Sequence, residues 1–174
     1  MKAAESPSNP IFTVVSKDNQ EVGAFKIEKK DYWSICDLIV ANEDRFMLFF
    51  PKTREQTLTP ELSKRFTEIK SKEFDARQEF LFTVKKEKKV IGLVYVKELN
   101  WETKQGELAY CIDYNFEGKG ITSKIIEGLS AFSFSKLGLE TLQIIVHKTN
   151  LPSIRVAERC KFTSYTFFFT LKRD

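Results

Sequence analysis

The sequence predicts an α/β domain built on one mixed β-sheet with helices on both faces. Runs rich in β-branched and aromatic residues are followed at irregular intervals by runs with helical spacing, which argues against a regularly alternating nucleotide-binding fold. A glycine loop at residues 118–120 joins a predicted strand to a predicted helix. The 174 residues are 42% hydrophobic and 30% charged, which suits one domain with its own core. We therefore expect a flexible lead-in over residues 1–10 and a single domain over residues 11–174.

The first half of the chain supplies strands on both sides of a helical segment. In chain order, we expect strands at 11–15 and 22–27, a helix at 32–41, a helix at 59–74, and strands at 79–84 and 90–96. Thr59 and Pro60 are typical of the cap and first position of the second helix. The lysine-rich stretch 85–89 separates the last two strands, and we interpret it as a solvated hairpin turn.

The second half has clearer boundaries because cap residues mark its helices. In chain order, we expect a strand at 107–113, a helix from 121 to about 137, a strand at 141–146, a helix at 150–159 and a strand at 161–171. Gly138 follows the first helix where a C-cap glycine is common. Asn150 and Pro152 are typical of the start of the second. Tyr165, Phe167, Phe168 and Phe169 make the last strand strongly aromatic.

The glycine loop predicts a phosphate-binding site. Gly118 and Gly120 flank Lys119, and an amphipathic helix begins at Ile121. The first N–H groups of a helix have no partner within the helix, and the helix dipole adds positive potential at the same end. Glycine lets a diphosphate approach the backbone without a Cβ in the way. A strand, a short glycine loop and a helix start therefore form a cradle for a phosphate ligand.

Four motifs then carry a resemblance to a known family. They are Gly-Glu-Leu-Ala-Tyr at 106–110, Phe-Glu-Gly-Lys-Gly-Ile-Thr at 116–122, Phe-Ser-Lys-Leu-Gly-Leu at 134–139 and Asn-Leu-Pro-Ser-Ile-Arg-Val-Ala-Glu-Arg at 150–159. In this order they resemble the GNAT superfamily of acyl-CoA N-acyltransferases, and most closely its RimJ/RimL-type branch. That branch acetylates protein N-termini, notably of ribosomal proteins, and in other members small amines. The resemblance implies a splayed mixed sheet and acetyl-CoA as the donor.

The resemblance also implies which residues contact the donor. The strand that carries Glu107 splays from its neighbour in this family, so backbone groups at Cys111, Ile112 and Asp113 would bind pantetheine and stabilise the oxyanion. The residues expected over the diphosphate are Gly118, Lys119, Gly120, Ile121 and Thr122, and those expected from the following helix are Asn150 and Ser153. We interpret Cys111 as a packing residue and not as a nucleophile, because the family transfers the acyl group directly.

Two side chains are candidates for proton transfer. Glu107 would accept a proton from the amine, through water, since an α-amine with a pKa near 8 needs less help than a lysine amine near 10.4. The alternative for Glu107 is an ordinary carboxylate paired with a neighbouring cation. Ser153 would protonate the CoA thiolate, and its alternative is a first-turn serine that satisfies helix N–H groups. His147 is the only histidine, and we interpret it as structural.

The acceptor is less well determined than the donor. The apolar stretch 45–51 includes Phe46, Phe49 and Phe50, which either pack in the core or form one wall of an acceptor groove. We expect a protein N-terminal α-amine as acceptor. The alternatives are a small amine (a polyamine, an aminoglycoside or an amino acid) and an inactive acyl-CoA sensor or scaffold. Asn115 and Lys161 differ from the usual family residues and keep this last alternative open.

Composition excludes several other classes. A net charge of +4 does not indicate nucleic-acid binding, and no apolar run has the roughly 20 residues of a membrane span. Three cysteines without metal-ligand spacing predict free thiols and no metal site. We expect a cytoplasmic location and allow for a homodimer.

Overall fold

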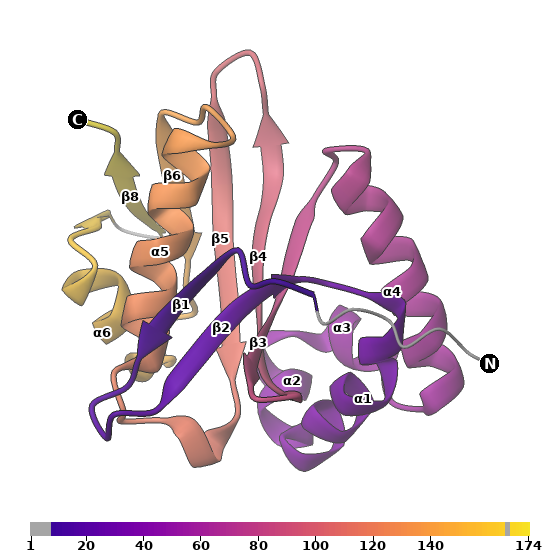
Figure 1. Cartoon of the computed structure of the whole chain (residues 1–174). Helices are drawn as coiled ribbons and strands as arrows, with labels where there is room; N and C mark the ends of the chain where they lie inside the picture. Colours follow the sequence, from indigo (N-terminus) through magenta and orange to yellow (C-terminus); the bar gives the residue numbers. More distant parts are fainter. Residues whose placement is uncertain (1–7, 166–167) are drawn as a thin grey trace.

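The computed structural model describes residues 8–165 and 168–174 of the chain (Figure 1). Most of the expected lead-in over residues 1–10 lies outside the described residues, as does Phe167 of the expected last strand. In the described part, no helix combines the length and hydropathy that a membrane crossing requires.

One mixed sheet runs through the molecule. Its strands are β1 (Phe12–Val15), β2 (Glu21–Lys26), β3 (Phe80–Lys86), β4 (Lys89–Asn100), β5 (Gln105–Ile112), β6 (Thr141–Ile145), β7 (Thr163–Ser164) and β8 (Phe168–Lys172). The spatial order is β1-β2-β3-β4-β5-β6-β8-β7. The described strand pairs are antiparallel except β5 and β6, which run parallel with the helix α5 (Ile121–Ser135) between them in sequence.

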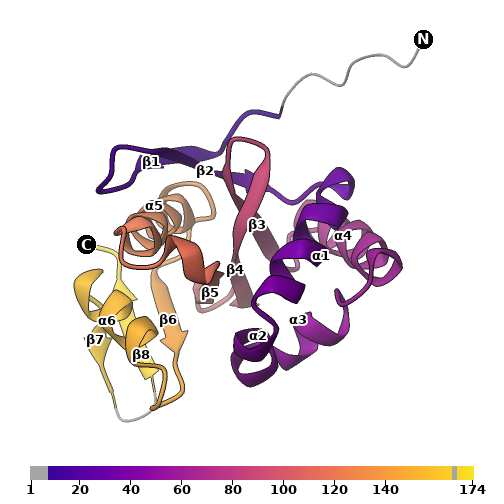
Figure 2. The ribbon, with the colours of Figure 1, turned by 90° about the horizontal axis from the view of Figure 1, so that it is seen from below.

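Helices cover both faces of the sheet, as Figure 2 shows. One face packs against α1 (Tyr32–Ala41) and α4 (Pro60–Asp75), with α2 (Glu43–Phe49) and α3 (Pro51–Glu55) between them in the chain. The other face packs against α5, with α6 (Leu151–Arg159) beside it. Side chains alternate along β5, so that Ala109 and Cys111 face the α1 layer while Leu108 and Tyr110 face α5. The predicted fold class is confirmed.

Local signals placed several elements correctly. The helix expected at residues 32–41 is α1, and Thr59 caps α4 by accepting a hydrogen bond from the Leu62 N–H at 3.3 Å. Two expectations were wrong. The apolar stretch 45–51 is not a connection but lies in α2 and the start of α3. The single strand expected at 161–171 is two short strands, β7 and β8, which pair antiparallel.

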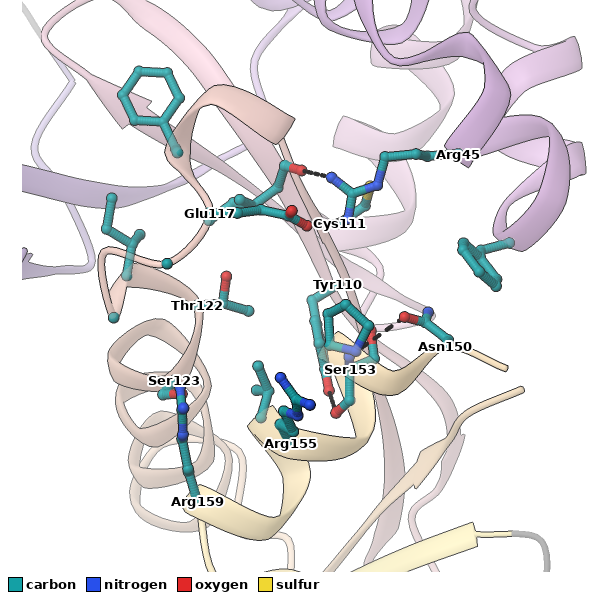
Figure 3. A pocket seen from close by; sticks show the side chains of 18 of the residues that line it. Arg45, Tyr110, Cys111, Glu117, Thr122, Ser123, Asn150, Ser153, Arg155 and Arg159 are labelled. Atoms are coloured by element: carbon teal, nitrogen blue, oxygen red, sulfur yellow. Dashed lines mark hydrogen bonds and ion pairs between the residues drawn. The ribbon is translucent and has the colours of Figure 1, made fainter. Parts of the chain in front are cut away.

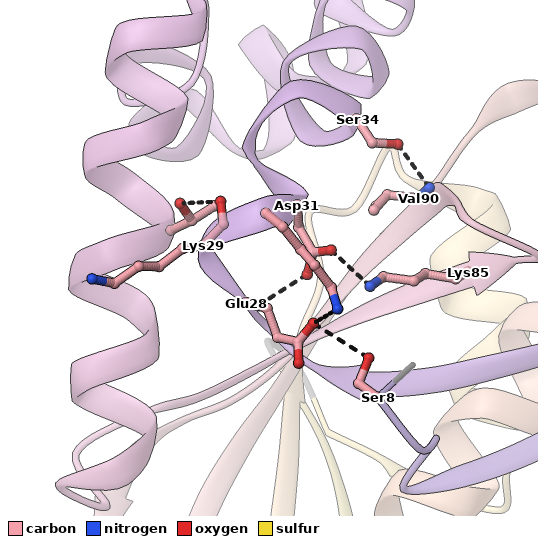
Figure 4. A network of polar contacts seen from close by, with 9 residues as sticks. Ser8, Glu28, Lys29, Asp31, Ser34, Lys85 and Val90 are labelled. Atoms are coloured by element: carbon pink, nitrogen blue, oxygen red, sulfur yellow. Dashed lines mark hydrogen bonds and ion pairs between the residues drawn. The ribbon is translucent and has the colours of Figure 1, made fainter. Parts of the chain in front are cut away.

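The lysine-rich stretch 85–89 forms the expected hairpin turn between β3 and β4, with residues 87–89 exposed, but its first residue differs from expectation. Lys85 is buried, and its ammonium lies 2.7 Å from the carboxylate of Asp31, which is also buried (Figure 4). Asp31 also accepts a hydrogen bond from the Glu28 backbone N–H at 2.9 Å. The Ser34 hydroxyl accepts one from the Val90 N–H at 2.9 Å. These polar contacts tie the start of α1 to the hairpin, so Lys85 is a structural residue and not part of a solvated turn.

Candidate functional site

The site begins where two neighbouring strands separate. The pairing of β5 with β6 covers Gln105 to Glu107 on one side and Thr141 to Gln143 on the other. Beyond Glu107, no residue of β6 pairs with β5 within the described chain. The remaining five residues of β5, Leu108 to Ile112, therefore border an opening inside the sheet.

The register of β5 shows which backbone groups face this opening. Successive residues of an antiparallel strand direct their N–H and C=O groups to alternate sides. The Asp113 N–H donates to the Ile91 carbonyl of β4 at 2.7 Å, so Asp113 and Cys111 direct their backbone groups away from the opening. Tyr110 and Ile112 direct theirs into it. Within the stretch expected to supply an oxyanion donor, the N–H available is therefore that of Ile112.

The glycine loop lies at one end of the opening. Gly118 and Gly120 both have φ of +73°, a left-handed conformation that glycine adopts at little cost, and Gly120 is the N-cap of α5. No atom lies within 4 Å of where a Cβ on Gly118 would be. The two glycines line one cavity together with Ile121, Thr122 and Ser123 at the start of α5. This geometry leaves the first N–H groups of α5 accessible to an anion.

Two residues expected at the donor site lie elsewhere. The Lys119 ammonium is 3.1 Å from the Asp18 carboxylate in the turn between β1 and β2, and Lys119 does not line the cavity. Its backbone carbonyl accepts a hydrogen bond from the Lys17 N–H, which fixes the glycine loop to that turn. The Asp113 side chain is buried and accepts the Asn115 N–H at 3.0 Å.

The start of α6 forms the opposite wall (Figure 3). The Asn150 side chain accepts the Ser153 N–H at 3.3 Å, as expected of a helix cap. The buried Tyr110 hydroxyl donates to the Ser153 carbonyl at 2.8 Å, which joins α6 to β5 across the opening. Ser153 lines the cavity beside Tyr110, at a position where its side chain can meet a bound molecule.

Charged residues that sequence reasoning missed complete this cavity. Arg155 and Arg159, one turn apart on α6, line its far end near Thr122 and Ser123 (Figure 3). Arg45 of α2 lines it from the other layer, with its guanidinium 2.5 Å from the Glu117 carboxylate. The arginine pair was detectable as an i, i+4 repeat on the predicted helix. Arg45 was not, because its partners lie 67 and 72 positions away in the chain.

Glu107 lies in a second cavity that adjoins the first. Phe49, Phe50, Tyr110, Asn150 and Ser153 line both. Burial of Glu107 raises the pKa of its carboxyl above the usual value, and the Lys97 ammonium 3.6 Å away partly opposes this shift. A carboxyl of raised pKa is a better proton acceptor than an ordinary one. The two interpretations of Glu107, a paired carboxylate and a base, are thus compatible.

The second cavity is mainly apolar. Apart from Glu107, the residues that line it are Leu48, Phe49, Phe50, Lys97, Leu108, Ala109, Tyr110, Ile144, Ile145, Val146, His147, Asn150 and Ser153. Of the three phenylalanines expected at an acceptor wall, the structure places Phe49 and Phe50 there and buries Phe46 in the core. His147 lies in the cavity, where its Nδ1 is 2.7 Å from the Thr149 hydroxyl.

Cys111 contacts the first cavity but is not an activated thiol. Burial raises its pKa to about 12, so it stays protonated at neutral pH. Cys36, Cys111 and Cys160 are all buried free thiols. No group of His, Cys, Asp and Glu able to hold a metal ion occurs in the described part of the chain.

The fold and this site define a class of protein. A sheet that opens between two parallel strands, with a glycine cradle at one end, is the architecture expected of an acyl-CoA-dependent acyltransferase. The family model of the acetyltransferase (GNAT) domain matches residues 25–163. The chain belongs to this family and is an acyltransferase.

Similar proteins support the predicted branch. The chain is 25% identical over 154 residues to YdaF of Bacillus subtilis, which is provisionally named a ribosomal N-acetyltransferase, covering 84% of this chain and 80% of YdaF. The fold of the present chain is similar to that of ribosomal-protein-S5-alanine acetyltransferase from Vibrio fischeri, with a TM-score of 0.82 and 19% identity. The match covers 92% of this chain and 98% of that structure. The fold is also similar to that of RimJ of Mycobacterium smegmatis in complex with CoA-disulfide, with a TM-score of 0.84, 10% identity and coverage of 92% and 86%.

Proposed function

We propose that this protein transfers an acetyl group from acetyl-CoA directly to the α-amine at the N-terminus of a polypeptide. The observation that carries the proposal is the opening between β5 and β6, with the glycine cradle at one end and Glu107 at the other. The thioester would lie between them, where the two cavities share Tyr110 and Ser153.

The donor would be held by three features of the first cavity. The N–H groups at the start of α5 would bind the diphosphate, because Gly118 and Gly120 expose the backbone there. The Tyr110 carbonyl and the Ile112 N–H would pair with the amides of pantetheine in place of a neighbouring strand. The guanidinium groups of Arg155 and Arg159 would bind the remaining phosphate of CoA.

The residues at the junction of the cavities would perform the chemistry. The neutral amine attacks the thioester carbonyl carbon, and its proton passes through water to Glu107. The Tyr110 N–H, which β5 directs into the opening at this junction, stabilises the negative oxygen of the tetrahedral intermediate. The C–S bond then breaks, and the Ser153 hydroxyl, whose proton solvent replaces, protonates the departing thiolate. The first-turn position of Ser153 on α6 supports this role, because it places the residue where the two cavities meet.

The composition of the second cavity favours a peptide over a polyamine. Glu107 is the carboxylate that lines it, and Lys97 already lies beside Glu107. A polyamine carries several positive charges and needs several carboxylates, whereas an N-terminus presents one amine followed by an uncharged backbone. The apolar walls at Phe49 and Phe50 suit the side chains of such a segment.

Titration calorimetry with acetyl-CoA tests the donor site, with Gly118→Asp compared with its neutral isostere Gly118→Asn. The two variants share any strain of the left-handed position, so the difference between them reports the negative charge placed in the cradle. We expect wild-type protein to bind, Gly118→Asn to bind more weakly, and Gly118→Asp to lose binding. Absence of binding by folded wild-type protein would overturn the proposal.

A thiol-release assay tests the acceptor. Peptides with free N-termini are compared with the same peptides after N-terminal blocking, and with spermidine. We expect CoA release with the free peptides and none with the blocked peptides or with spermidine. Turnover with spermidine but with no peptide would favour a small-amine acetyltransferase, and binding of acetyl-CoA without any turnover would favour a sensor.

A further inference from the structure

Arg45 joins three parts of the molecule that serve different steps of the proposed reaction. It lies on α2, the helix that ends at Phe49 on the acceptor wall. One guanidinium nitrogen donates to the Ile112 carbonyl at the end of β5, at 3.0 Å. Another lies 2.5 Å from the carboxylate of Glu117, which directly precedes Gly118 of the cradle. Both side chains are about one-third exposed or less, so these contacts are partly shielded from water.

The guanidinium geometry makes this junction stiff. A planar fork that bonds two acceptors holds both in one plane and loses little side-chain freedom per bond. A second contact lies beside it, since the Asn42 side chain at the junction of α1 and α2 accepts the Tyr114 N–H at 2.9 Å. Any movement of the loop that carries Glu117 is therefore transmitted to α2.

We infer that Arg45 is a positioning residue that couples occupation of the donor cradle to the acceptor wall. The inference rests on the proposed function. Binding of a diphosphate at Gly118 and Gly120 would order the adjoining loop, Glu117 would hold Arg45, and α2 would fix Phe49 and Phe50 for the acceptor. The acceptor would then bind more tightly to the protein that carries acetyl-CoA.

Arg45 also has an electrostatic effect that must be separated from the coupling. Its positive charge offsets the Glu117 carboxylate, which would otherwise repel the diphosphate next to it. Arg45→Met should therefore weaken acetyl-CoA binding through charge alone, whereas Glu117→Gln should not. The double variant removes both charges, so we expect it to restore donor binding while leaving α2 unlinked to the cradle.

Hydrogen–deuterium exchange measures the coupling without an acceptor. Acetyl-CoA at saturating concentration should slow exchange in wild-type peptides covering residues 114–124 and residues 43–50. In Glu117→Gln and in the double variant, acetyl-CoA should still slow exchange in residues 114–124. The slowing of exchange in residues 43–50 should fall by at least half. Glu43→Gln is the matched control, because Glu43 is also on α2 and pairs with Arg54, away from the cradle.

Three outcomes separate the possibilities. If wild-type protein fails to bind acetyl-CoA, the proposed function fails and the inference with it. If it binds but exchange in residues 43–50 does not change, the coupling is wrong while the donor site stands. The coupling would also be wrong if acetyl-CoA slowed exchange in residues 43–50 equally in wild type, in Glu43→Gln and in the double variant. If the coupling is correct, the KM for the acceptor peptide should be about fivefold higher or more in the double variant than in wild type. A factor of about five is the low end of ordinary coupling between two binding sites.

Discussion

At the scale of single residues, Glu107 is governed by two opposing effects. Burial raises the pKa of its carboxyl, and the Lys97 ammonium at 3.6 Å lowers it. As the proposed base, Glu107 must be deprotonated to work, so activity should fall as the pH drops through its pKa. Burial therefore moves that acidic limb to higher pH, and Lys97 moves it back to lower pH.

Lys97→Met should move the acidic limb of the kcat/KM profile to higher pH. The change removes the influence that lowers the Glu107 pKa, so a larger fraction of Glu107 is protonated at any pH near the limb. Activity at pH 6 should fall more than activity at pH 8. Measured pH–rate profiles check this, with Lys104→Met as control because Lys104 pairs with the exposed Glu140. A limb that stays in place would remove Glu107 from the base role.

At the scale of elements, α6 combines a cap, a serine that faces the cavity and two arginines on one short helix. Asn150 and Ser153 lie in its first turn beside the reactive junction, and Arg155 and Arg159 follow along the same cavity. The helix therefore contacts the donor over most of its length in the proposed complex.

Replacing both Arg155 and Arg159 by Gln should weaken acetyl-CoA binding by about tenfold or more, since bonds between an arginine and an anion are strong. The loss should largely disappear when dephospho-CoA, which lacks the 3′-phosphate, is the probe. Calorimetry with both probes measures the difference. Equal losses for the two would mean that the arginines contact another part of the donor.

The sequence predicted elements best where the determinants are local. Thr59 with Pro60 marks α4, and Asn150 with Pro152 marks α6. The helix α2 was missed because the consecutive apolar residues 46–50 show no helical period, and α3 was missed because its five residues are too few to show one. The break between β7 and β8 was missed because residues 165–167 include no glycine, proline, asparagine or aspartate to indicate a turn, and the aromatic residues fit one longer strand equally well.

The same limit applies to the site. Gly118, Gly120, Asn150 and Ser153 were predictable because their roles follow from helix starts and short motifs. Arg45 was not, because its two partners lie far away in the chain and on another layer. The direction of the Lys119 side chain was also not predictable, since it depends on Asp18 in a distant turn.

At the scale of the whole molecule, the two layers of helices are attached to the sheet by different means. The α5 layer is held mainly by apolar packing. The α1 layer has its own apolar core, and in addition the buried pair of Lys85 and Asp31 at the start of α1. This polar attachment lies far from the proposed reaction, so its loss should affect stability and not the donor site.

Lys85→Met should lower the free energy of unfolding by about 3–5 kcal/mol, because it leaves the Asp31 carboxylate buried without its partner. Adding Asp31→Asn should recover part of this loss. Urea unfolding followed by circular dichroism checks both, again with Lys104→Met as the control for an exposed pair. A loss in Lys85→Met no larger than that of the control would show that the pair is not a stabilising contact.

The separation of β5 from β6 has one more consequence, for solubility. A strand with free hydrogen-bonding groups is normally a template for association with strands of other molecules. Here the backbone groups of Tyr110 and the N–H of Ile112, which pair with no neighbouring strand in the described chain, lie within the sheet, between Phe49 and Phe50 on one side and Asn150 and Ser153 on the other. Residues of α2 and α6 line the opening on both sides and thus hinder the approach of the edge of another sheet. The protein thus has an interior edge that is protected from aggregation by its own helices.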